Sequence, residues 1–123
     1  MITKEQIEKA KKEIALQDDP HHEHDDCIRI AYEWLDAQRK TKKPSTRSRP
    51  LKHLIENWAG RYVSQSDVEI AAHLHPDISG KYSRYNISSR LTEPSMDRLK
   101  NIGEALTQGY RKSHRPENYK LQE

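Results

Sequence analysis

Between residues 50 and 62, apolar and polar side chains alternate with the period of an α-helix. Apolar residues stand at i, i+3, i+4, i+7, i+8 and i+11, which is the spacing of one helix face: Leu51, Leu54, Ile55, Trp58, Ala59 and Tyr62. Pro50 fits the first position of such a helix. The pattern predicts an amphipathic helix over 50–62 that packs this face against a core.

Two further helices are predicted upstream. Thr3 and Gln6 have the spacing of a capping box, and the narrow apolar stripe that follows predicts a surface-lying helix over 3–16. Asp19-Pro20 is typical of a helix start, and we expect this second helix to run to about Lys40. Its apolar face would comprise Cys27, Ile28, Ala31, Trp34, Leu35 and Gln38.

Downstream, the pattern predicts three shorter helices. A second capping box, Ser66 to Glu69, begins one that ends near His75-Pro76. We expect another over 81–91, although its serine and asparagine content weakens the helical pattern. A third follows Pro94-Ser95 and ends near Gly109, and the polar residues 110–123 are expected to form a flexible tail.

These elements define an all-α fold class: a small helical bundle of about five or six helices. Two valines and no phenylalanine argue against an all-β fold. We divide the chain into an acidic N-terminal helical region (1–43), a basic linker (44–49), a helical domain (50–109) and the flexible tail (110–123).

Length and composition limit the class of protein further. A chain of 123 residues allows one compact domain rather than a two-domain enzyme. The single cysteine, Cys27, excludes an internal disulfide and is typical of a reducing compartment. No apolar run approaches the ~20 residues of a membrane span, and the N-terminus has no apolar signal core. We therefore expect a cytoplasmic protein without a membrane partner.

The formal net charge of +3 conceals a strong asymmetry. Residues 1–38 carry a net charge of −5, whereas residues 39–123 carry +8. A basic body with an acidic head is typical of a chain that binds a polyanion through the body. The alternative is that the two halves simply attract each other.

The stretch 64–106 resembles the DNA-binding domains of the lambda-repressor and Cro type, which belong to the helix-turn-helix superfamily of phage and bacterial regulators. Three segments carry the resemblance: Val68-Glu-Ile-Ala71-Ala-His-Leu74, Ile87-Ser-Ser-Arg90-Leu91, and Pro94-Ser95 with Leu99, Ile102, Ala105 and Leu106 after it. It covers about a third of the chain, and the turn that begins at His75 is longer than the family's.

The resemblance implies that the helix over 81–91 enters the major groove of DNA. The residues then expected to contact bases are Lys81, Tyr82, Arg84, Tyr85, Asn86 and Arg90, with Ser83 on a phosphate. It also implies a homodimer on paired half-sites. The alternative for this stretch is a plain helical hairpin.

The segment 39–49 contains six basic residues and no acidic one. We expect it to lie along DNA phosphates through Arg39, Lys40, Lys42, Lys43, Arg47 and Arg49. The alternative is a solvated linker.

Other chemistry is sparse. His21-His22-Glu23-His24-Asp25-Asp26-Cys27 contains metal-ligating residue types, but one helix face offers only two of them, and zinc needs three or four. A solvated, acidic helix start is the competing interpretation, and we predict no metal and no cofactor. No phosphate-binding glycine loop and no nucleophile motif is present, so we do not expect an enzyme.

The sequence therefore predicts a small, sequence-specific protein that binds double-stranded DNA, a transcription regulator of the phage or mobile-element type. The alternative is a helical protein-interaction module, an adaptor or inhibitor that contacts a protein partner through the acidic residues 1–38 and binds no nucleic acid.

Overall fold

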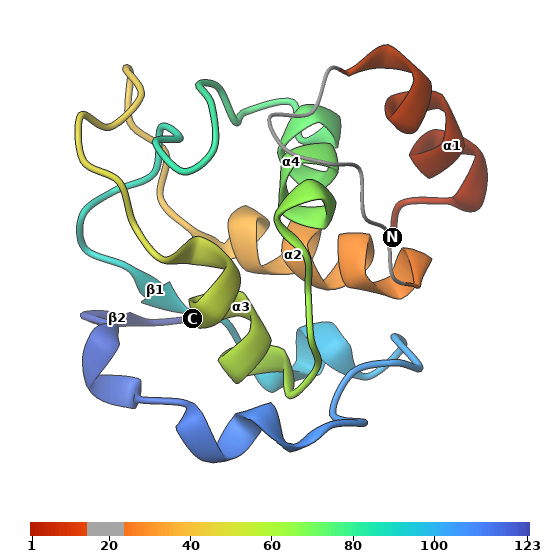
Figure 1. Ribbon diagram of the computed structural model, residues 1–123. Coiled ribbons are helices and arrows are strands. Elements are labelled where there is room, and N and C mark those ends of the chain that lie inside the picture. Colours follow the sequence, from red (N-terminus) through yellow and green to blue (C-terminus); the bar gives the residue numbers. More distant parts are fainter. Residues whose placement is uncertain (15–23) are drawn as a thin grey trace.

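The computed structural model describes residues 1–14 and 24–123 (Figure 1). Four α-helices form most of its regular structure: α1 (Lys4–Glu13), α2 (Asp25–Ala37), α3 (Leu51–Ala59) and α4 (Gln65–Leu74). The described residues include only two short strands, β1 (Thr92–Glu93) and β2 (Leu121–Gln122), which pair in parallel. The all-α class is confirmed, whereas the predicted count of five or six helices is not. None of the described helices is long and apolar enough to cross a bilayer.

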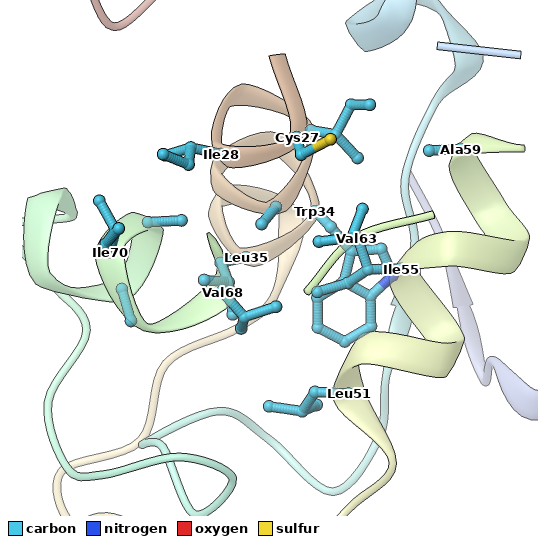
Figure 2. Packing of buried hydrophobic residues seen from close by; sticks show 14 of the residues in the cluster. Cys27, Ile28, Trp34, Leu35, Leu51, Ile55, Ala59, Val63, Val68 and Ile70 are labelled. Atoms are coloured by element: carbon cyan, nitrogen blue, oxygen red, sulfur yellow. The ribbon is translucent and has the colours of Figure 1, made fainter. Parts of the chain in front are cut away.

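The core lies where α2, α3 and α4 meet (Figure 2). Trp34 of α2 and Trp58 of α3 are its largest fully buried side chains. The Trp34 indole N–H donates to the Tyr119 hydroxyl at 2.9 Å, and that of Trp58 donates to the Pro94 carbonyl at 3.1 Å. Each buried indole therefore has a hydrogen-bond partner, which removes the cost of burying its N–H.

Local hydrogen bonds from capping side chains determine where α1, α2 and α4 begin. The capping box of Thr3 and Gln6 is present on α1, as predicted. On α4 the predicted capping box was wrong by two residues, because Ser64 caps the helix together with Asp67, and Ser66 lies inside it. The predicted start of the second helix at Asp19-Pro20 lies outside the described residues; as described, α2 begins at Asp25 with His24 as its cap.

The predicted helix over 81–91 is wrong. These residues form turns and extended backbone, and Lys40 and Ile87 make an antiparallel bridge. The backbone N–H groups of Thr41 and Ser45 donate to the carbonyls of Asn86 and Tyr85 at 2.8 and 3.2 Å. Pairing with a distant segment therefore replaces the weak local preference of a stretch rich in serine and asparagine.

The predicted long helix after Pro94-Ser95 is also wrong. Only a single 3-10 turn, η1 (Met96–Leu99), forms there, and turns follow it. The N–H groups of Leu106 and Gln108 donate to the Ala59 and Gly60 carbonyls at 2.7 and 2.9 Å. This segment thus satisfies carbonyls at the end of α3, and doing so draws its backbone out of a helix.

The C-terminal residues differ from the expected flexible tail. They form two 3-10 helices, η2 (Gly109–Ser113) and η3 (Pro116–Asn118), before β2. Tyr119 is buried in the core, and the Glu123 carboxylate receives hydrogen bonds from Arg98. The end of the chain therefore packs against α2 and β1.

Candidate nucleic-acid interface

The basic segment 39–49 and the stretch that contains the expected DNA-reading residues 81–91 lie side by side. Residues 39–49 run antiparallel to residues 78–91, and we call these two segments together the paired basic loops. Besides the hydrogen bonds of Thr41 and Ser45, the Ser88 N–H donates to the Arg39 carbonyl at 2.8 Å. In Figure 1 both loops lie on the left of the molecule, away from α1. Two stretches that are remote in sequence thus form one surface.

The paired basic loops carry nine lysines and arginines and no acidic residue. The net charge of the whole chain is only +3, so the remainder of the chain is net acidic. Seven of the nine side chains are exposed, and within the described residues none of the seven forms an ion pair. They are Arg39, Lys42, Lys43, Arg47, Lys81, Arg84 and Arg90. A surface of this kind attracts polyanions.

The other two basic residues, Lys40 and Arg49, are half-buried. The Lys40 ammonium donates to the carbonyls of Leu35, Asp36 and Gln38 at 3.0, 2.8 and 2.7 Å and thereby closes the end of α2. Burial lowers the pKa of Lys40, against the attraction of nearby carboxylates. The Arg49 guanidinium donates to the Ser88 carbonyl at 2.9 Å. Both hold the loops in place, and their predicted contacts with phosphate stay predictions.

Asn86, predicted to contact a base, is buried and fastens the loops from inside. Its side-chain oxygen accepts from the Ser79 N–H at 2.7 Å. Its side-chain nitrogen donates to the carbonyls of Thr41 and Asp77 at 3.1 and 2.9 Å. One amide therefore joins residues 77–79 to the other loop at Thr41, and both of its N–H donors are used within the protein, which leaves none for adenine.

Ser83, Tyr85 and Tyr82 also face inward. The Ser83 hydroxyl lies 2.6 Å from that of Ser48 and accepts from the Arg49 N–H. Tyr85 is buried, and its burial raises the pKa of the phenol. Tyr82 is half-buried, and burial raises its pKa as well. Packing within the protein occupies these side chains, and their contacts with DNA stay predictions.

At Gly80 the two loops approach each other closely. Its φ of +102° is unfavourable for residues with a side chain. A Cβ there would lie 2.8 Å from the Arg84 carbonyl oxygen and 2.9 Å from the Pro44 Cβ. The turn that presents Lys81 and Arg84 consequently depends on glycine.

The acidic residues of α2 have a different environment. Asp25 pairs with Lys11 at 3.1 Å, Asp26 pairs with Arg29 at 2.7 Å, and Arg98 bridges Glu33 and Asp36. Although burial alone would raise the pKa of Asp36, hydrogen bonds from His75 and Arg98 hold it below its ordinary value. These carboxylates therefore stabilise the fold rather than present an open acidic surface.

The predicted metal-ligating cluster is only partly within the described residues, because 21–23 fall outside them. Among the residues that are described, no group of three histidine, cysteine, aspartate or glutamate side chains could hold a metal. Cys27 is buried, and its thiol donates to the Tyr62 carbonyl at 3.4 Å.

Sequence reasoning treated the two basic segments separately and missed their pairing. One signal was present: 39–49 and 78–91 are both basic, and neither contains an acidic residue. The chain matches no family model, no curated protein and no solved structure. What the paired basic loops can do is therefore inferred from their own residues.

Proposed function

We propose that the paired basic loops bind the phosphate backbone of double-stranded DNA. The observation that carries this proposal is the exposure of seven basic side chains on two linked loops that contain no acidic residue. Lysine and arginine bind phosphates through charge-assisted hydrogen bonds and release the counterions that surround DNA.

The hydrogen bonds between the loops support this function because they fix in advance the backbone that carries the basic side chains. Asn86 and Ser83 hold the loop backbones, and Gly80 allows the close turn between them. A surface formed before binding loses less conformational entropy on binding than a flexible arm does. The proposed site thus differs from a solvated linker.

This proposal departs from the helix-turn-helix expectation in its geometry. α4 occupies the place of that unit's first helix, but the second helix is absent, so loops take over the contact with DNA. Regulation of transcription and pairing of two copies on DNA stay predictions from the resemblance.

The protein-interaction module stays the alternative. It rests on the acidity of residues 1–38, and the acids of α2 are largely matched by Lys11, Arg29 and Arg98. No described feature therefore favours it over DNA binding.

Fluorescence anisotropy with a labelled duplex of about 20 base pairs tests the proposal across ~50–200 mM salt. We expect affinity to fall steeply with salt, with a log–log slope no steeper than about −6 if all seven exposed residues contact phosphate. Absence of binding at the lowest salt, or binding that does not respond to salt, would contradict the proposal.

A pair of charge-matched variants makes this test specific to the loops. Lys43→Glu with Arg84→Glu changes the proposed site, whereas Lys9→Glu with Lys12→Glu makes the same change in net charge on α1. We expect the first pair to lose affinity by roughly 100-fold, about 2.7 kcal/mol, and the second to lose much less. Equal losses in the two would indicate attraction to net charge alone.

A further inference from the structure

The geometry of the paired basic loops points to a substrate class narrower than nucleic acid in general. We infer that they bind a duplex through its backbone, with little regard for base sequence, and that they bind single strands more weakly. This inference rests on the proposed function and specifies which nucleic acids the same site binds more tightly than others.

The first support is that side chains suited to reading bases are already hydrogen-bonded or buried within the protein. Asparagine can pair with adenine through two hydrogen bonds, but the Asn86 amide already makes three contacts within the protein. Ser83 is hydrogen-bonded to Ser48, and Tyr85 is buried. Apart from their arginines, the loops therefore present little of the chemistry that distinguishes one base pair from another.

The second support concerns single strands, which proteins bind by stacking bases on exposed aromatic rings. Every tryptophan and tyrosine in the chain is buried or half-buried. The two tyrosines of the loops, Tyr82 and Tyr85, pack edge to face against each other with ring centroids 6.3 Å apart. The loops thus have charge but no fully exposed aromatic ring on which an unpaired base could stack.

The third support is the shape of the contact. Residues 75–91 contain no α-helix that could lie in a major groove. What projects from the loops is lysine and arginine, and contacts of such residues with phosphate fix position without reading sequence. The exposed side chains with the clearest capacity to read a base are the four arginines, because arginine can pair with guanine through two hydrogen bonds. They are Arg39, Arg47, Arg84 and Arg90.

A competition assay tests this inference. A labelled duplex bound to the full chain is displaced by unlabelled GC-rich duplex, AT-rich duplex, or single strands of the same length. We expect the two duplexes to compete within about threefold of each other, since a specific site loses roughly 5- to 150-fold per mismatched base pair. We expect the single strands to compete less well by about fivefold or more, because the loops lack exposed rings on which unpaired bases stack.

Two outcomes would overturn the inference while leaving nucleic-acid binding intact. One is a preference of tenfold or more, roughly the effect of one read base pair, for either duplex. The other is single-strand competition equal to or better than that of the duplexes. Failure of every nucleic acid to bind is a separate outcome, which would reject the proposed function itself.

Arg84→Lys sharpens the test because lysine keeps the charge and lacks the planar donor pair. Under backbone binding, this variant retains its affinity for both duplexes to within about threefold. A selective loss on the GC-rich duplex, with the AT-rich duplex unchanged, would show that Arg84 reads guanine and would contradict the inference.

Discussion

The acidic side of α2 and the paired basic loops are both dense in charge, but they use it in opposite ways. On α2, Asp25, Asp26, Glu33 and Asp36 each lie within 3.1 Å of a cationic side chain of the protein. On the loops, seven basic side chains point to solvent without an ion pair among the described residues.

This difference separates charge that holds the fold from charge that is available to a partner. The Arg98 guanidinium forms ion pairs with Glu33, Asp36 and Glu123 at once. It therefore balances much of the negative charge on this side of the molecule. These hydrogen bonds, with that of Glu123 the largest, raise the pKa of the Arg98 guanidinium despite its partial burial. The loops have no such ion-paired centre; their backbones are held by Asn86 and by Lys40 and Arg49, whose side chains donate to backbone carbonyls. We therefore expect mutations on the two sides to separate stability from binding.

The largest effect on stability is expected from Asn86→Ala. It would leave the carbonyls of Thr41 and Asp77 and the N–H of Ser79 without their side-chain partner. We expect the free energy of unfolding, measured with urea, to fall by roughly 2–3 kcal/mol. DNA affinity should fall too, although the net charge is unchanged; unaltered affinity would mean that the loops need no fixed arrangement.

Arg98→Met should destabilise the fold somewhat less, by about 1–3 kcal/mol, because the ion pairs are only partly buried. DNA affinity should change by less than about twofold, since Arg98 lies outside the loops. Urea unfolding and anisotropy on the same sample measure both quantities. A large loss of affinity without a loss of stability would place Arg98 in the binding surface.

Acid should weaken the fold through the same residues. Hydrogen bonds from Arg98 lower the pKa of Glu123. Burial by itself would raise the pKa of Glu93, but hydrogen bonds from His114 and Gln122 bring it below its ordinary value. With Asp36, these carboxyls contribute stability that is complete above the ordinary values of 3.8 and 4.5 and is lost as pH falls through the lowered ones. Arg98→Met should flatten this loss for Asp36 and Glu123, as a pH series of unfolding curves would show.

The smallest change in the free energy of unfolding is expected for a variant with two exposed loop cations removed. Lys43→Ala with Arg47→Ala removes two exposed side chains that form no ion pair among the described residues. The free energy of unfolding should change by no more than about 0.5 kcal/mol. A clear destabilisation would show that these cations hold the fold, and the contrast with α2 would fail.

The sequence predicted those elements whose apolar spacing and caps are local. The stripe from Leu51 to Trp58 and the box of Thr3 and Gln6 correspond to α3 and α1. It did not predict residues whose structure is set by distant partners. Ser83 and Asn86 pair with 39–49, and Leu106 donates to the end of α3.

The sequence predicted the positive charge of the candidate site but not the arrangement of its two loops. Charge singled out the basic residues of 39–49, and the resemblance singled out Lys81, Arg84 and Arg90; seven of these nine are exposed. The inward orientation of Tyr85 and Asn86 could not be read from a pattern that also fits a helix. Only the pairing of the two segments determines which side chains remain outside.

Mapping the contact of the ¹⁵N-labelled protein with a short duplex by NMR tests the central claim most directly. The claim predicts that the largest amide shifts occur at 42–47 and 79–84, with α1 and the acidic face of α2 unchanged. Shifts concentrated on α1 and α2, with the paired basic loops unaffected, would contradict it.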